Sequence, residues 1–212
     1  MTAANIILAV RQDVKDAAKS NIVRGEVPSG DVDAVNKRFY LAYQPIVTAS
    51  AKVYQNGTLL TLTTNYTIDE ETGIITFVAI PAVGTKIEVD YYYNWFNDAS
   101  YTSFLDNASQ SLGFASATIT SIPEGLIPAT LKFVAHYYYK ARAAFYANRF
   151  NSSTAGQTVN VDVITKNFKD LATECWEEAI ELRNDYYKKF GQQNQPASAV
   201  TAPSISNYTP QR

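Results

Sequence analysis

The spacing of apolar residues changes twice along this chain of 212 residues, and these changes constrain the fold more than any other feature. Over residues 4–19 and again after residue 97, apolar side chains recur every three or four positions, as on one face of a helix. Between residues 37 and 96 they alternate with polar side chains, as in half-buried strands. The sequence therefore predicts an α+β protein, in which an antiparallel β module is inserted into a helical bundle of long helices.

Three chain reversals divide residues 37–96 into short strands. Asn56-Gly57 tolerates the positive φ angles of a tight hairpin turn, and residues 69–73 and 81–84 supply two further turns. The run from Ile87 to Tyr93 then alternates apolar and polar side chains. We expect an antiparallel β-sandwich or small barrel of about five or six strands. The ends of such folds usually lie close together, which suits an insertion between helices.

Helical spacing predicts four helices. The first covers residues 4–19, with Arg11 on a charged face, and belongs with the following Gly- and Pro-containing linker to an N-terminal segment over residues 1–36. The other three form a helical bundle domain over residues 97–190. Gly113 ends the first of these, and Pro128 lies in the first turn of the next. Their expected bounds are Asp98 or Ser100 to Leu112, Pro128 to Phe150, and Val161 to Phe190.

Each of the last two helices is expected to present two apolar faces. In the final helix the main stripe comprises Ile164, Phe168, Leu171, Cys175, Ala179, Leu182 and Tyr186, and a thinner stripe comprises Trp176, Ile180 and Tyr187. One face is enough for packing within the chain. The second face therefore indicates packing against a neighbouring copy.

Residues 191–212 have the composition of an extended tail rather than of a packed element. They contain three prolines, many small polar residues and a single charge, on Arg212. Such a segment is expected to be extended or disordered alone and to bind a partner. The side chains expected to make that contact are Pro196, Val200, Pro203, Ile205, Tyr208, Pro210 and Arg212.

The charge balance and the residue counts exclude several classes of protein. A net charge of -2 provides no concentrated basic face for nucleic acid, although DNA could slide past such a surface without specific binding. The single cysteine allows no intrachain disulfide. The first residues lack the basic region of a signal peptide and are expected to open a helix. No apolar stretch approaches the ~18 residues of a membrane span, so no membrane association is expected.

No group of residues has the pattern of a catalytic, cofactor-binding or metal site. The sole histidine, His136, lies within a helical aromatic run, and Cys175 lies on an apolar stripe, so both are expected to pack. An enzyme would require one of them to line a pocket with a perturbed pKa. The acidic clusters at Asp31 to Asp33 and Asp69 to Glu71 are interpreted as solvated loops. We expect no enzyme and no cofactor.

Aromatic and acidic side chains are the candidates for interaction surfaces. The fifteen tyrosines fit half-buried interfaces or a tyrosine-rich core equally well. The run from Tyr91 to Phe96 fits a seam between the β module and the helices, a subunit interface, or a sugar-binding face. The possible interface aromatics are Tyr92, Trp95, Tyr137, Trp176 and Tyr187. The possible channel-facing acids, which otherwise form a solvated helix face, are Glu174, Glu177, Glu178 and Glu181.

Several short motifs of the β segment occur together in a module found in structural proteins of tailed bacteriophages and prophages. They are Phe39-Tyr40-Leu41, Pro45-Ile46, Val53-Tyr54, Asn56-Gly57, Tyr66-Thr67-Ile68-Asp69, Gly73-Ile74-Ile75-Thr76-Phe77, Pro81, Gly84 and Ile87 through Tyr93. Over about 60 residues, the segment resembles that module. The helical half is similar in plan to head–tail adaptor (connector) proteins, in which a long helix opens at a proline, as at Ile127-Pro128-Ala129, before a final helix and a C-terminal extension.

The resemblance implies a structural protein of the virion, made in the host cytoplasm. It implies a ring of commonly about twelve copies between the portal and the tail, around the DNA exit channel. The C-terminal tail would dock on the portal, and a tail or neck protein would contact the other side. Two alternatives remain open: another neck, tail-completion or fibre-anchoring protein, and a module that binds carbohydrate or a cell surface through its tyrosines and tryptophans.

Overall fold

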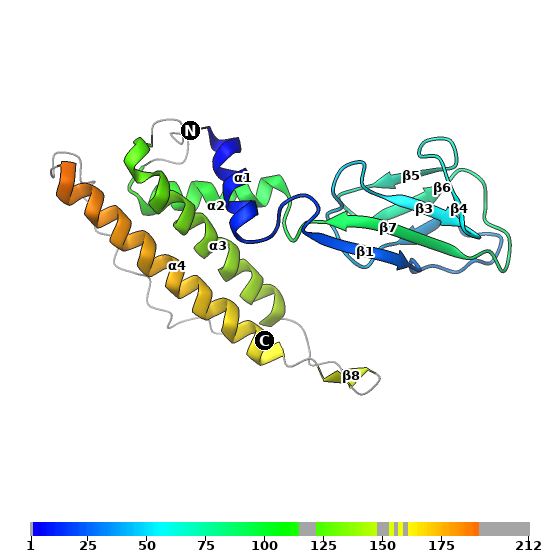
Figure 1. The fold of residues 1–212 in the computed structure, drawn as a ribbon. Helices are drawn as coiled ribbons and strands as arrows, with labels where there is room; N and C mark the ends of the chain where they lie inside the picture. The colour runs from blue at the N-terminus through cyan, green and yellow to red at the C-terminus, as the bar shows by residue number, and fades with distance from the viewer. Residues whose placement is uncertain (1, 115–121, 148–152, 155–156, 159–160, 191–212) are drawn as a thin grey trace, which may run out of the picture. The chain divides into compact units, whose positions relative to one another are not determined.

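The structure, a computed structural model, describes residues 2–114, 122–147, 153–154, 157–158 and 161–190. Within them the chain is α+β, with four α-helices and two antiparallel sheets of three or more strands (Figure 1). The chain divides into two compact units. We call Arg11–Ser100 the β unit, and Met1–Val10 with Tyr101–Arg212 the helical unit.

The β unit contains a four-stranded sheet and a three-stranded sheet, and all their strand pairs are antiparallel. The first has the order β1 (Asn21–Glu26), β7 (Ile87–Tyr93), β3 (Lys52–Gln55), β4 (Thr58–Leu59); the second has the order β2 (Arg38–Tyr40), β6 (Ile74–Phe77), β5 (Tyr66–Asp69). Neither sheet closes on itself in the described residues, so the small barrel that we considered is wrong. The two sheets share one apolar core, which includes Phe39, Val53, Ile75, Phe77, Ile87 and Val89.

The predicted turns of the β unit are confirmed. Asn56 and Gly57 have φ angles of 49° and 80°, and they join β3 to β4 with Tyr54 opposite Leu59. Gly73, at φ 68°, precedes β6 in the second hairpin. These positive φ angles explain why glycine and asparagine occupy the turns, since other side chains are strained there.

Strand β1 was not predicted. It pairs with β7 through Asn21, Ile22 and Val23, and the register then shifts before Glu26. Gly25, at φ 62°, lies in this irregularity and donates its N–H to Asp90 Oδ1 at 2.7 Å. Because the bulge interrupts the period of two, the segment has the sequence pattern of a linker. The expected boundary at residue 37 therefore leaves out a strand that belongs to the sheet.

Helix α1 (Ala3–Asp13) is shorter than the predicted helix over residues 4–19. Lys15 and Lys19 have φ angles of 56° and 74°, which a right-handed helix does not allow. Arg11, expected on a charged face, is only 7% exposed. The helix therefore ends where the chain turns to bury Arg11 and Asp16.

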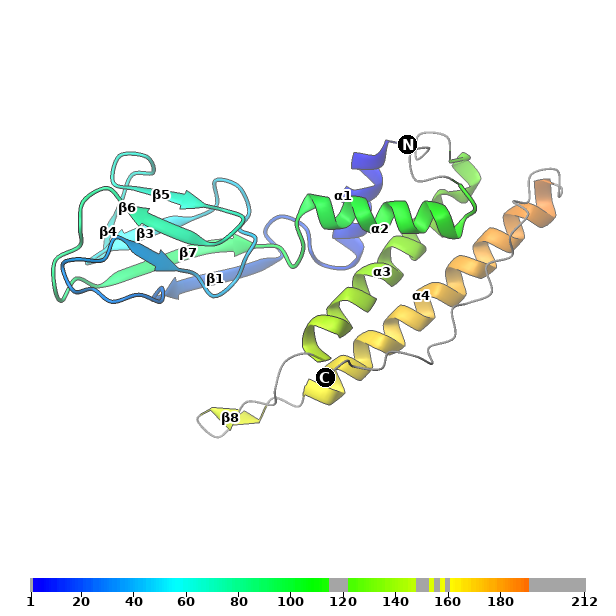
Figure 2. The same ribbon diagram turned by 180° about the vertical axis from the view of Figure 1, so that it is seen from behind.

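The other helices follow the predicted bounds closely. Helix α2 (Asp98–Ser111) is capped by Asn97, whose Oδ1 accepts the Ser100 N–H at 2.9 Å. A short 3₁₀ turn (Glu124–Leu126) leads into α3 (Ile127–Ala147), and α4 (Val161–Phe190) has the bounds that we expected. The predicted end of α3 at residues 148–150 lies outside the described residues. Figures 1 and 2 show α3 and α4 side by side in the helical unit.

The buried face of α4 is rotated from the predicted main stripe. Its buried residues are Val161, Thr165, Ala172, Cys175, Ala179 and Tyr187, whereas Leu171 and Leu182 are 38% and 37% exposed. Helix α3 brings the large rings of Phe133 and His136 to this contact. His136 contacts Ala172, and small buried residues such as Ala172 and Ala179 allow the two helices to approach each other. The main stripe that we predicted from residue size and hydrophobicity therefore lies partly on the exposed side of α4.

Arg11 and Asp16 form a buried ion pair, and their further contacts join two distant segments of the β unit. Asp16 is fully buried, accepts the Trp95 backbone N–H at 2.6 Å and pairs with Arg11 at 3.7 Å. Arg11 also contacts Asp98 Oδ1 at 2.8 Å and the Phe96 carbonyl at 3.2 Å. The segment after α1 is thereby bonded to the segment that enters α2.

Replacing Asp16 by alanine should lower the free energy of unfolding by about 3 kcal/mol, because the buried Arg11 loses one of its two carboxylates and the Trp95 N–H loses its acceptor. Urea unfolding of the full chain measures this. Asp13→Ala, at an exposed position on α1, is the matched control and should change it by less than about 0.5 kcal/mol. Equal effects of the two substitutions would contradict a structural role for the buried pair.

Candidate interaction surface

The aromatic run of α3 is divided between the core and the contact with α4. Tyr138 is buried and stacks on Tyr101 at 6.0 Å. Tyr137 is half-buried, and its hydroxyl forms a hydrogen bond of 2.9 Å with Ser111 Oγ. His136 points toward α4, where its Nδ1 lies 2.7 Å from the Ala172 carbonyl oxygen. Since a carbonyl only accepts, Nδ1 carries the proton of the neutral imidazole.

Trp176 of α4 is held by rings of α3. Its ring centroid lies 5.0 Å from that of Phe133, nearly edge to face, and 4.9 Å from that of His136. The side chain nevertheless remains half-buried, as does Ile180 one turn later. These two residues leave a short apolar strip beside the buried face of α4, with a fixed indole at one end.

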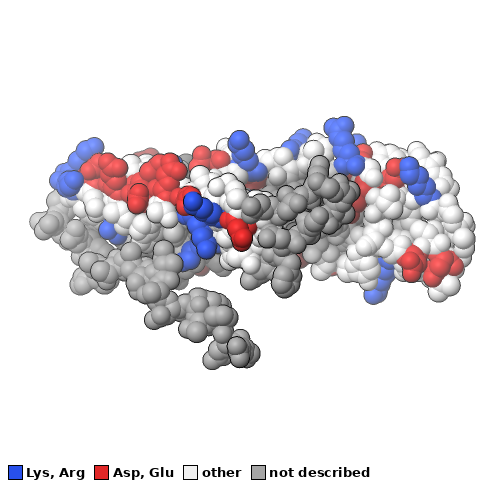
Figure 3. Space-filling view, turned by 90° about the horizontal axis from the view of Figure 1, so that it is seen from below, with Lys and Arg blue, Asp and Glu red and all other residues white. Residues whose placement is uncertain are grey.

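Next to this strip, the outward side of α4 carries a row of carboxylates. Asp170, Glu174, Glu177, Glu181 and Asp185 are all exposed, and they follow one another at steps of four, three, four and four residues. Figure 3 shows acidic side chains gathered on the helical unit, with basic side chains bordering them. Like charges at i,i+4 destabilise a helix by about 0.2–0.5 kcal/mol per pair, so this row is locally unfavourable.

Few of these carboxylates are neutralised. Glu178, beside the row, forms an ion pair of 2.6 Å with Lys132 of α3, and Asp185 lies 3.5 Å from Lys188. Glu174, Glu177 and Glu181 form no salt bridge with any residue in the described ranges. The row therefore projects uncompensated negative charge from the middle of α4.

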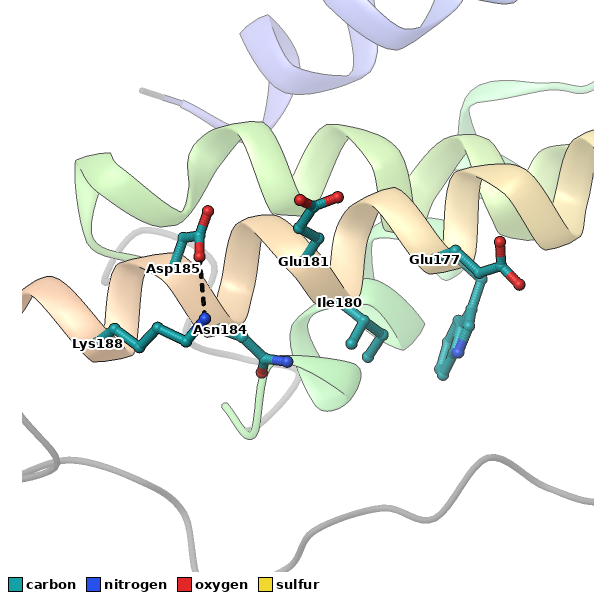
Figure 4. Close-up of a pocket in the computed structure, with 7 residues that line it drawn as sticks. Glu177, Ile180, Glu181, Asn184, Asp185 and Lys188 are labelled. Atoms are coloured by element: carbon teal, nitrogen blue, oxygen red, sulfur yellow. Dashed lines mark hydrogen bonds and ion pairs between the residues drawn. The ribbon is translucent and has the colours of Figure 1, made fainter.

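Apolar and acidic side chains line one groove along α4 (Figure 4). In this view Ile180 and Asn184 project to one side of the helix axis, and Glu181 and Asp185 project to the other. Among the described residues, the groove is lined by Trp176, Glu177, Ile180, Glu181, Asn184, Asp185 and Lys188. We call this surface the α4 groove. Three of the predicted interface aromatics and acids, Trp176, Glu177 and Glu181, thus line one surface.

The other predicted interface aromatics have different surroundings. Tyr187 is 8% exposed and donates its hydroxyl to the Leu112 carbonyl at 3.4 Å, so it packs inside the helical unit. Tyr92 and Trp95 are half-buried in the β unit, where Trp95 lies 5.6 Å from Tyr93. Tyr43, 41% exposed, stacks on Tyr93 at 4.6 Å. This aromatic ladder extends the core of the β unit toward its surface.

Pro196, Val200, Pro203, Ile205, Tyr208, Pro210 and Arg212 lie outside the described residues. The acids that we predicted to face a channel lie on α4, where Glu174, Glu177 and Glu181 are exposed and Glu178 is half-buried in its ion pair. Ile180 was assigned only to a packing stripe by the sequence. Its spacing of four from Trp176 is the signal that could have joined it to this surface.

Across residues 2–114, 122–147 and 161–190, no three His, Cys, Asp or Glu side chains come together in a way that could hold a metal ion. Cys175 is buried at 9% exposure. Within the part of the chain that the structure describes, no helix combines the length and the apolar character needed to cross a bilayer.

Comparison with protein-family models and with curated proteins finds no match for this chain in either set.

Acidification should weaken the contact between α3 and α4. Burial lowers the pKa of His136 below its ordinary value of 6.5, against the hydrogen bond to the Ala172 carbonyl, and Lys140 lowers it further. Well above pH 6.5 the imidazole is neutral in both the folded and the unfolded chain, so its protonation does not reduce the free energy of unfolding. As pH falls from 6.5 toward the folded pKa, the unfolded chain takes up the proton first and stability is lost.

A His136→Gln variant should lack this part of the pH dependence. The measurement is the urea midpoint of the wild type and the variant at pH 7 and at about pH 5.5. Between these two pH values, we expect the urea midpoint to fall further in the wild type than in the variant. Parallel pH profiles would show that His136 does not couple the packing of α3 on α4 to pH.

Removing charge from the acidic row should stabilise the helical unit. Glu177→Gln with Glu181→Gln should raise the free energy of unfolding by about 0.5 kcal/mol at low salt, because repulsion between like charges is relieved. Glu178→Gln is the control and should lower it by a similar amount, since the ion pair with Lys132 is lost. Thermal unfolding at low and high salt measures both, and both effects should shrink with salt. A double variant that is less stable than the wild type at low salt would contradict this prediction.

Proposed function

We propose that this chain is a structural protein of a tailed-phage virion, namely a head–tail adaptor. In this proposal about twelve copies form a ring between portal and tail around the DNA channel, and residues 191–212 dock on the portal. The β unit would have the sandwich arrangement of a phage structural module, and the helices would form the adaptor bundle.

The observation that carries the proposal is the one-sided burial of α4. This helix of 30 residues runs to Phe190, and the partner-seeking tail begins at the next residue. Its buried side chains lie on the face toward α3, while Leu171, Leu182 and Phe190 remain 38%, 37% and 69% exposed. A helix with apolar side chains left exposed suits a subunit that packs against neighbours. Repetition around a ring would multiply the weak contacts of single tails.

The balance of charge supports passage of DNA without specific binding. The net charge is -2, and the middle of α4 carries uncompensated carboxylates. Such a surface repels phosphates and so would not retain the duplex. Another neck, tail-completion or fibre-anchoring protein is the alternative, because the β unit has its own core and could be attached to different virion proteins. The ring size and its neighbours in electron micrographs distinguish these roles.

Removal of residues 191–212 should abolish attachment to the portal and leave the fold intact. The truncated chain should keep the circular dichroism spectrum and the unfolding midpoint of the full chain, but it should no longer cosediment with portal rings. A chain in which the tail is replaced by a Gly/Ser segment of equal length is the control for length and should behave like the truncation. Unchanged cosedimentation of the truncated chain would overturn portal docking by the tail.

A further inference from the structure

The α4 groove offers apolar surface in a fixed place. Trp176 is held between Phe133 and His136, at ring distances of 5.0 and 4.9 Å, so its exposed edge is pre-positioned. Ile180 follows one helical turn later and lines the same groove (Figure 4). Because these two side chains are already held in place, little conformational entropy is lost in this chain when a partner contacts them.

The charge beside the apolar strip specifies what kind of partner fits. Glu177 and Glu181 lie one turn apart, parallel to Trp176 and Ile180, and they form no salt bridge with a described residue. The chain retains this arrangement although like charges at this spacing weaken the helix. Two parallel rows, one apolar and one acidic, are complementary to an apolar row flanked by basic side chains.

We propose that the α4 groove docks a basic amphipathic segment of a partner protein. The segment presents apolar side chains to Trp176 and Ile180, and Lys or Arg side chains to Glu177 and Glu181. Both rows of the groove have a spacing of four residues, which matches the i,i+4 spacing of a partner helix. The inference goes beyond the proposed function and does not require it.

Charge disfavours two other occupants. Nucleic acid would bring its phosphates against the carboxylates. The same face of α4 from a second copy, aligned over Asp170 to Asp185, would place one acidic row near another, because the exposed residues of this stretch on this side are acidic at every step of three or four. Lys188, beyond the row, is the one basic side chain among the described residues of the groove. A basic segment neutralises the row and at the same time covers the indole.

The two tryptophans of the chain make the test specific, since Trp95 lies in the β unit and Trp176 in the groove. In a Trp95→Phe background, the only indole emission comes from Trp176. The probe is a synthetic helical peptide without Trp or Tyr, with leucines at i,i+4 beside lysines at i,i+4. Titration should shift the Trp176 emission to the blue. Anisotropy of the fluorescein-labelled peptide with the wild-type chain gives the same affinity without any substitution.

Three controls separate docking from general attraction of charge. Glu177→Lys with Glu181→Lys should weaken binding by at least about tenfold. Asp13→Lys with Asp31→Lys makes the same change in net charge at exposed positions of the β unit and should leave affinity unchanged. A scrambled peptide of identical composition, with its leucines and lysines spread around the helix, should bind at least about tenfold more weakly.

Equal binding of the scrambled peptide, or an unshifted Trp176 emission at saturation, would overturn the proposal. So would a change in oligomeric mass of the peptide-free chain on Glu177→Lys with Glu181→Lys, measured by light scattering. That result would show that a second copy covers the groove. Because none of these measurements involves the portal or residues 191–212, failure here is distinguishable from failure of the proposed adaptor role.

Discussion

Helix α4 buries one face against α3 and leaves the opposite face in solvent, and the organisation of the helical unit depends on this contact. Small residues such as Ala172 and Ala179 occupy the buried face, and the rings of α3 fill the space between the helices. The hydrogen bond from His136 to the Ala172 carbonyl fixes the rotation of one helix against the other. That rotation decides which side chains of α4 remain outside. The exposed leucines, the acidic row and the edge of Trp176 are therefore consequences of one packing arrangement.

The β unit is stabilised separately, by an apolar core to which both sheets contribute. Its two ends are bonded together by Arg11, Asp16 and Asp98 rather than by apolar packing alone. Burying a carboxylate and a guanidinium carries a cost in solvation, which the Trp95 N–H and the Phe96 carbonyl offset. We infer that this pair serves mainly to fix one arrangement of the chain at this point. A unit with its own core and bonded ends has the properties expected of an inserted module.

The elements that could be predicted are those whose signal is local. The Asn56-Gly57 turn needs two positive φ angles, Pro128 suits a first helical turn, and the bounds of α4 follow from its period. Strand β1 was missed because Gly25 shifts its register, and the burial of Arg11 and Asp16 depends on partners that lie about 80 positions away. At the surface of α4, the candidate aromatics and acids could be named from the sequence. Their meeting in one groove depends on the rotation of α4 against α3, which residue size alone does not indicate.

The central claim is that the chain assembles into a ring through surfaces that it leaves uncovered on its own helices. Native mass spectrometry of the purified full-length chain, alone and with portal protein, tests this most directly. A single closed oligomer of about twelve copies, formed alone or on the portal, is the predicted result. A chain that remains monomeric in the presence of portal protein would contradict it.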